Sequence, residues 1–156
     1  MYSPFAFSQF NYSVYDGDFN QLPNFSALSP IETGTSNVIT LDVTGQTETF
    51  GMVFTNQLNV STADTFEFQT TSDDGSRLFI DDTLVVDNDG LHGAETVNGQ
   101  IFLNAGSYNL RVEFFEKNGG KFWMLNTVVQ QTLFPPYPLM ERSAYPRLPK
   151  WASGAP

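Results

Sequence analysis

The chain has 156 residues, no Cys, one His, and 17 acidic residues against 7 Lys and Arg, for a formal net charge of −10. This length suits one domain with a core of its own. The lack of Cys excludes disulfides and thiolate metal sites, and His92 alone excludes a multi-histidine zinc site. The charge argues against a nucleic-acid partner, because phosphate binding depends on clusters of Lys and Arg.

Neither a membrane span nor a signal peptide is predicted from the sequence as given. The N-terminus lacks a basic region followed by a continuous apolar region. No apolar stretch approaches the roughly eighteen residues that a spanning helix needs.

Short runs of alternating apolar and polar residues predict β-strands along most of the chain. The predicted strands cover residues 10–15, 38–43, 50–58, 65–70, 77–80, 83–86, 100–103, 107–116 and 122–130. Asp81 and Asp82 predict a tight hairpin turn between two of these strands, and the 15 Phe suit a thick aromatic core between two sheets. The predicted fold class is therefore all-β, an antiparallel two-sheet β-sandwich.

The two ends of the chain depart from this pattern. We expect an N-terminal extension at 1–11, the sandwich at 12–133 and a Pro-rich tail at 134–156, where six of the nine Pro favour extended backbone. Two alternatives stand for the tail: a linker to a neighbouring domain, or a segment that docks on its own sandwich or on another copy. The docking residues would be Tyr137, Leu139, Tyr145, Arg147, Lys150 and Trp151.

The acidic residues gather in the middle of the chain, where residues 73–89 hold six Asp and one Arg. Carboxylate and amide oxygens near strand ends are the ligands that Ca²⁺ takes. An EF-hand loop is excluded, because placing Gly90 at loop position six puts Val85 and Thr96 at the first and last ligand positions. A solubilising acidic surface is the alternative to a cation site.

From about residue 12 to 130, the chain resembles the protective-antigen-type β-sandwich family, which includes bacterial adhesins and fungal flocculins. The motifs that carry the resemblance are FEF at 66–68, SDDGSRLFID at 72–81, LVVDNDGLHG at 84–93, LNAGSY at 103–108 and LRVEFFE at 110–116. The family serves glycan binding, toxin assembly and structural roles, so the resemblance implies the fold more firmly than one function.

The resemblance implies a Ca²⁺ site. In lectin members, two consecutive Asp joined by a cis peptide bond hold Ca²⁺, a second loop adds oxygens, and the ion coordinates sugar hydroxyls. The implied metal ligands here are Asp73, Asp74, Glu116, Asn118 and Gly120, and the implied sugar-binding residues are Asp73, Asp74, Lys117 and Trp123. Lys117 and Lys121 flank this site and weaken it electrostatically, and the Cys-linked specificity insertions of the fungal lectins are absent.

An alternative to the metal site is a turn in which Asp73 and Asp74 cap backbone N–H groups and pair with Arg77. We expect residues 87–89 to form a turn, His92 to make structural hydrogen bonds, and Arg77 and Arg111 to serve internal ion pairs. Trp123 is also expected in the core, although beside the second loop it could stack on a sugar ring.

No enzyme is predicted, because no nucleophile elbow, phosphate loop or nicotinamide-binding motif occurs. The function predicted is an extracellular or cell-surface adhesion module that binds a glycan or a surface polysaccharide with Ca²⁺. The alternative is a structural subunit that assembles into a filament, surface layer or virion through its tail and N-terminus, as a homo-oligomer or polymer.

Overall fold

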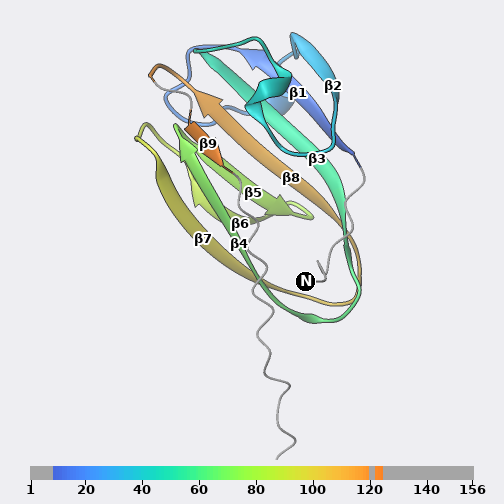
Figure 1. The fold of residues 1–156 in the computed structure, drawn as a ribbon. Helices are drawn as coiled ribbons and strands as arrows, with labels where there is room; N and C mark the ends of the chain where they lie inside the picture. Colours follow the sequence, from blue (N-terminus) through green and yellow to red (C-terminus); the bar gives the residue numbers. More distant parts are fainter. Residues whose placement is uncertain (1–8, 120–121, 125–156) are drawn as a thin grey trace, which may run out of the picture.

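The computed structural model describes residues 9–119 and 122–124, with side chains described for 9–119. They form two antiparallel sheets packed face to face, as predicted for a β-sandwich (Figure 1). The larger sheet has the strand order β2-β1-β3-β8-β5-β6, and the smaller has the order β7-β4-β9. The strands are β1 Phe10–Asp16, β2 Glu32–Ser36, β3 Phe50–Val60, β4 Asp64–Asp73, β5 Ser76–Ile80, β6 Thr83–Asn88, β7 Glu95–Leu103, β8 Gly106–Glu116 and β9 Phe122–Met124.

The core lies between the sheets and is built from alternate residues along the strands. On β8, Leu110, Val112 and Phe114 are buried in the main core, whereas Arg111 on the same strand is half-buried. The longest pairing joins β3 to β8 over eleven residue pairs, and it places the inward residues of both strands side by side. The alternation predicted for residues 107–116 is therefore confirmed, since successive strand residues point to opposite faces.

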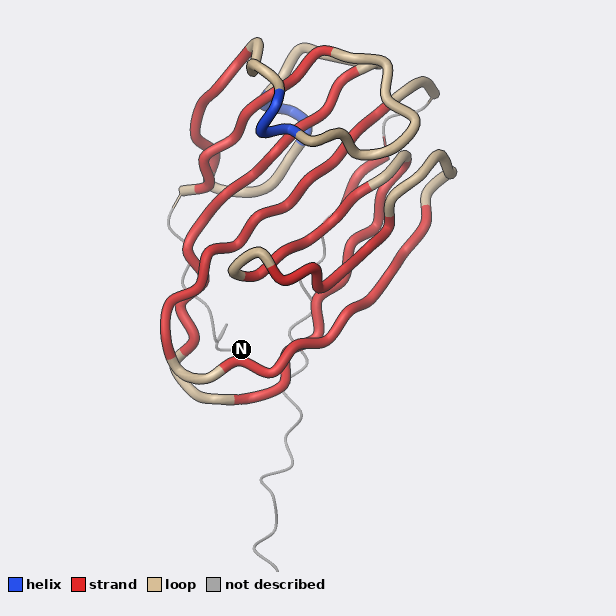
Figure 2. The backbone as a smooth tube through the Cα atoms, turned by 180° about the vertical axis from the view of Figure 1, so that it is seen from behind, coloured by secondary structure: helices blue, strands red, loops and turns tan. Residues whose placement is uncertain are grey.

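A second, smaller apolar cluster lies on the outer face of the larger sheet. Phe115 is fully buried there against Leu22 and Phe25, which come from the loop between β1 and β2. This loop contains the 3-10 turn η1 (Phe25–Ala27) and lies over the upper part of the outer face when the molecule is seen from behind (Figure 2). The Phe25 ring approaches Gly51 so closely that a Cβ at Gly51 would lie 2.6 Å from it. Among the described residues, no loop covers the lower part of the outer face in this way.

One predicted strand is wrong. Residues 38–43 form no strand; instead Thr40 caps the 3-10 turn η2 (Leu41–Val43) by accepting a hydrogen bond from the Asp42 N–H. Leu41 is buried in the main core and Ile39 and Val43 pack against it, so the alternating apolar residues face the core from an irregular segment. In Figure 1, η2 lies over the inner side of the larger sheet, next to the smaller sheet.

Other differences concern length and position. The edge strand β2 was not predicted, because its sequence ETGTS lacks apolar residues. Strand β7 starts at Glu95 rather than at residue 100. In its first half, every second residue places a polar side chain on the outer face of the smaller sheet. The predicted strand at 122–130 is described only over β9, and the tail 134–156, with its proposed docking residues, lies outside the described residues.

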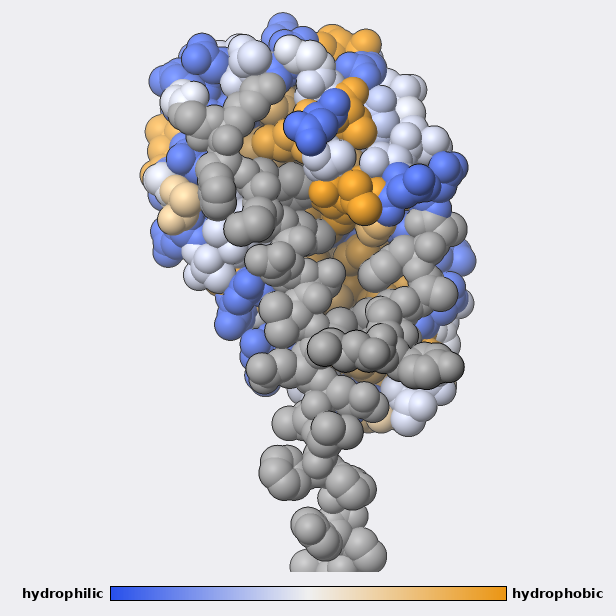
Figure 3. Space-filling model, in the orientation of Figure 1, coloured by the Kyte–Doolittle hydropathy of each residue, from blue (hydrophilic) through white to orange (hydrophobic). Residues whose placement is uncertain are grey.

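Among the described residues, no helix has the length and apolar character needed to cross a bilayer. On the face seen in Figure 3, a large part of the described hydrophobic surface lies toward the middle of the molecule, and smaller hydrophobic areas lie at the top and left margins among hydrophilic residues.

The two sheets touch most closely where β6 faces β7. A Cβ built at Gly99 on β7 would overlap the carbonyl oxygen of Val85 on β6. Only Gly lets the two backbones approach this closely, so Gly99 allows β6 and β7 to pack directly against each other at this edge of the sandwich.

We expect Gly99→Ala to lower the free energy of unfolding by about 1–3 kcal/mol or more, because overlap with a backbone atom forces strand β7 to shift. Urea denaturation measures the change. Gly45→Ala is the matched control: nothing lies within 4 Å of a Cβ at Gly45, so its midpoint should stay unchanged or rise slightly. Equal stability of the two variants would contradict the assignment.

Candidate metal centre

Three carboxylates meet at one end of the sandwich, where strands from both sheets finish. Asp73 is the last residue of β4 in the smaller sheet, Asp74 follows it, and Glu116 is the last residue of β8 in the larger sheet. One oxygen from each lies within 4.8 Å of the other two. Asp74 is 6% exposed and Glu116 is fully buried, whereas Asp73 is half-buried. The site is therefore a seam between the sheets with one partly accessible side.

The peptide bond between Asp73 and Asp74 is cis, as the family resemblance implied. Both oxygens of Asp74 accept hydrogen bonds from backbone N–H groups of other loops. The His92 N–H donates to Oδ1 at 3.3 Å, and the Lys117 N–H donates to Oδ2 at 2.9 Å. A carboxylate has about four lone-pair sites, so these two bonds orient Asp74 and leave acceptor capacity on each oxygen.

A buried polar network supports the turn between β4 and β5. The hydroxyls of Ser72 and Ser76 lie 2.8 Å apart, and the Asn88 amide donates to Ser72 Oγ at 3.1 Å and to the Glu95 carbonyl at 3.1 Å. All three of these side chains are buried, and their hydrogen bonds satisfy one another. The network fixes the end of β4, and therefore the position of Asp73.

Gly75 lets the turn pack against its surroundings. Its carbonyl accepts a hydrogen bond from the Phe115 N–H at 3.0 Å, which joins the turn to β8. A Cβ at this position would lie 2.5 Å from the Phe115 ring and 2.9 Å from the Gly90 backbone nitrogen. The glycine in the sequence Asp-Asp-Gly therefore permits a close approach of three segments.

Of the two lysines that flank the site in the sequence, Lys117 directs its charge away from the carboxylates, and Lys121 lies outside the described residues. The Lys117 ammonium pairs with Asp18 at 3.2 Å and also donates to Asn20, both in the loop between β1 and β2. Its charge is thus matched by a carboxylate outside the cluster. This side-chain direction supports a cation site rather than a direct role of Lys117 toward a sugar.

Three oxygen ligands of this kind suit a hard cation. Ca²⁺ binds oxygens at about 2.3–2.6 Å, so two ligands of one ion lie at most about 5 Å apart, and the 4.8 Å limit of this group fits that span. Three carboxylates held together repel one another, and a divalent cation offsets that repulsion. The residues present therefore fit Ca²⁺, with Asp73, Asp74 and Glu116 as the residues that would hold it.

The remaining predicted site residues are placed only in part. Asn118 is exposed in the loop after β8, and Gly120 lies outside the described residues. Trp123 is in β9, where its backbone pairs with Ser72, but its side chain is not described.

The acidic residues at the end of β6 serve the fold, and Arg77 forms the internal ion pairs predicted for it. The turn predicted at 87–89 is wrong for two of its residues, because Asp87 and Asn88 still pair in β6 and only Asp89 lies beyond the strand. Arg77 pairs with Asp87 at 3.0 Å and with Asp89 at 2.9 Å. The second carboxylate also accepts the Leu22 N–H at 2.7 Å, which fastens the loop between β1 and β2 to the sandwich. The sequence did not predict this contact. Asp89 and Leu22 are far apart in the chain, and no motif around either residue indicates that they meet.

His92 makes the structural hydrogen bonds predicted for it. Its Nδ1 lies 2.9 Å from the Gly93 carbonyl and its Nε2 lies 3.0 Å from the Asn88 carbonyl. Burial alone would lower the pKa of His92, but these two carbonyls, with Glu95 and Asp74 nearby, raise it above its ordinary value. Only the protonated ring can donate to both carbonyls.

Fold and site together define a β-sandwich module with a carboxylate cluster at one end. The chain belongs to the PA14 domain family, whose sequence pattern matches residues 12–131. A PA14 sugar-binding domain from an RTX adhesin has a similar fold, with a TM-score of 0.55 and 14% identity over 76% of this chain and 87% of that one.

Two further similarities concern larger proteins. The chain is 30% identical over 70 residues to the anti-sigma-I factor RsgI3 of Acetivibrio thermocellus, a match that spans 44% of this chain and 11% of that protein. The structure of an anti-sigma factor domain-containing protein has a TM-score of 0.58 and 22% identity over 78% of this chain and 44% of that one. The structural likeness shows a shared fold, and both matches span less than half the length of the relative.

A pH prediction follows from His92. Because its folded pKa is raised above 6.5, its contribution to stability is fully present below pH 6.5 and is lost as the pH rises through the folded pKa. Urea midpoints measured in EDTA from about pH 6 upward should fall in the parent chain and fall less in His92→Gln, which cannot gain a proton. The same slope in both proteins would contradict the assignment.

Proposed function

We propose that this chain is a non-enzymatic, extracellular glycan-binding module that uses Ca²⁺ held by Asp73, Asp74 and Glu116. The observation that carries the proposal is the meeting of these three carboxylates from both sheets within 4.8 Å. The similarity to a sugar-binding domain of an adhesin supports the ligand class and the surface location.

The accessibility of the site favours binding of an external ligand. Glu116 and Asp74 are buried, while Asp73 is half-buried, so the cluster is closed on the core side and open on one outer side. Ca²⁺ takes six to eight oxygens, more than three carboxylates supply as single ligands. Bound there, the ion would offer its remaining positions to vicinal hydroxyl groups of a sugar.

The arrangement is unsuited to glycoside hydrolysis. A glycosidase needs a carboxylic acid that delivers a proton to the substrate and a second carboxylate across the scissile bond. Both oxygens of Asp74 accept backbone N–H groups, so neither is placed to donate a proton. Glu116 is buried with no exposed surface, which keeps it from a sugar ring. These contacts favour a cation ligand set over an acid–base pair.

Calcium should raise the melting temperature. At a free concentration one hundred times the dissociation constant, binding stabilises the native state by about 2.7 kcal/mol, or roughly 5–10 °C for a domain of this size. Asp73→Asn keeps the shape of the side chain and removes a charge, so it should abolish most of this increment. Differential scanning calorimetry with CaCl₂ and with EDTA measures both.

Asp42→Asn is the control, since Asp42 is an exposed carboxylate in η2, away from the cluster, and its variant should keep the full increment. An equal melting temperature of the parent chain in CaCl₂ and in EDTA would rule out the metal site. A glycan array probed under the same two conditions tests the ligand: Ca²⁺-dependent signals lost in Asp73→Asn support the proposal, and an array on which no signal depends on Ca²⁺ opposes it.

A further inference from the structure

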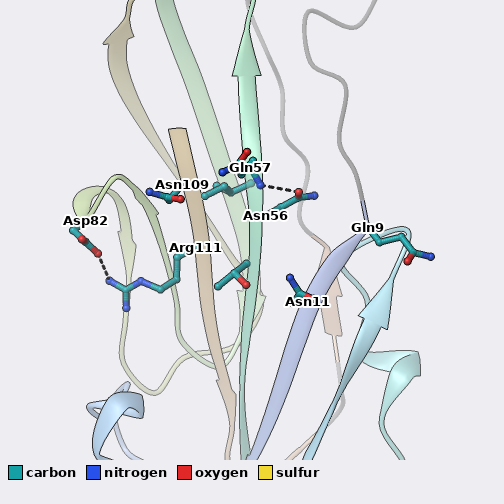
Figure 4. Close-up of a pocket in the computed structure, with 9 residues that line it drawn as sticks. Gln9, Asn11, Asn56, Gln57, Asp82, Asn109 and Arg111 are labelled. Atoms are coloured by element: carbon teal, nitrogen blue, oxygen red, sulfur yellow. Dashed lines mark hydrogen bonds and ion pairs between the residues drawn. The ribbon is translucent and has the colours of Figure 1, made fainter. Parts of the chain in front are cut away.

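A polar hollow lies on the lower part of the outer face of the larger sheet, which no described loop covers. It has a volume of about 450 Å³, within the range of roughly 300–1,000 Å³ for small-molecule sites. Its floor comes from β1, β3 and β8, and its rim comes from the turn between β5 and β6 (Figure 4). The lining is dominated by amide side chains.

Strand register aligns these side chains in rows. Asn11 on β1 is opposite Thr55 on β3, and Thr55 is opposite Arg111 on β8. The next row toward the lower end pairs Gln57 on β3 with Asn109 on β8. Neighbouring strands lie about 4.8 Å apart and alternate residues about 7 Å apart, so the rows form a small grid of hydrogen-bonding groups.

Two contacts hold the rim of the hollow in place. Asp81, with φ 45°, accepts hydrogen bonds from the Asn109 backbone N–H at 2.7 Å and from its side-chain amide at 2.9 Å. The Arg111 guanidinium lies 4.0 Å from the centre of the Phe79 ring. These contacts fix the β5–β6 turn and the cation before any ligand arrives, which lowers the cost of binding.

Other lining groups are available to a ligand. The side chains of Asn11, Thr55 and Gln57 are exposed and donate no side-chain hydrogen bond to another described residue. An amide offers two N–H donors and a carbonyl acceptor in one plane, so a single amide can bind two adjacent hydroxyl groups.

The charge of the hollow selects an uncharged ligand. Among the described residues that line it, the charged ones are Asp82 and Arg111, which pair with each other at 3.6 Å, and Arg111 also pairs with Glu113. The negative charge of the whole chain disfavours anions, and no second exposed carboxylate lines the hollow to attract a cation. A compact, neutral, hydroxyl-rich molecule matches this lining.

We propose that this hollow is a second, metal-independent binding site for neutral oligosaccharides, with Asn11, Gln57 and Asn109 as its main hydrogen-bonding groups. The site is separate from the carboxylate cluster. Arg111 and Glu116 are five residues apart on β8, about 17 Å, and their side chains point to opposite faces of the sheet. The proposal does not depend on Ca²⁺.

The test uses the full chain in EDTA. Side-chain amide resonances of Asn11, Gln57 and Asn109 are followed by ¹H–¹⁵N NMR during titration with neutral glucose, galactose, mannose and N-acetylglucosamine oligosaccharides. Saturable shifts of these resonances by at least one of the sugars are expected. The double variant Asn11→Ala/Gln57→Ala removes two hydrogen-bonding groups, so the affinity should fall about tenfold.

Gln69→Ala is the matched control, because this amide lies on the outer face of the smaller sheet and its loss should leave the titration unchanged. Asp73→Asn should also leave it unchanged, which separates this site from the calcium site. The proposal is overturned if none of the sugars shifts these resonances in EDTA, if binding requires Ca²⁺, or if the double variant binds as the parent chain does. Shifts produced only by a polar peptide such as hexaglycine would assign the hollow to a different ligand.

Discussion

The carboxylate of Asp74 is the contact on which this end of the molecule depends. It accepts one N–H from the loop between β6 and β7 and one from the loop after β8, so one buried side chain ties three connections together. Backbone N–H groups that are buried must find an acceptor, and here a single acidic group supplies it for two of them. The same contact leaves the three carboxylates in one place. Asp74 therefore holds the loops at this end of the sandwich and also belongs to the candidate cation site. A change of its charge would affect both.

Much of the fold could be predicted from local patterns, and the failures have physical causes. Alternation identified β8 and its two faces: Phe114 and Phe115 point to opposite sides of the sheet, and each is buried in a different apolar cluster. The same alternation was misleading at 38–43, since three apolar side chains can face a core from a 3-10 turn as well as from a strand. Strand β2 escaped prediction because its pairing with β1 is made by backbone hydrogen bonds rather than by apolar side chains. Propensity reports side-chain preferences, whereas tertiary contacts decided these two segments: core packing at 38–43 and strand pairing at β2.

Only part of the carboxylate site could be predicted from the sequence. The spacing of residues alone indicated an acidic loop; only the family resemblance brought Glu116, 42 positions after Asp74, to the same place, and the structure brings those side chains together. Two features remained beyond reach of the sequence. The direction of the Lys117 side chain depends on Asp18 and Asn20, about a hundred residues away. The rows of amides in the hollow depend on the register of β1, β3 and β8, which no single segment encodes.

The unequal size of the two sheets has a consequence for how this module can vary. Three strands cannot cover the inner face of six, and the segment with Ile39, Leu41 and Val43 fills part of the difference. An irregular segment in that position has to keep its apolar contacts with the core, but it needs no register with a neighbouring strand. Relatives could exchange or lengthen it without disturbing β4 or β8. Change in this segment is therefore limited by the apolar contacts at positions 39, 41 and 43 rather than by strand pairing.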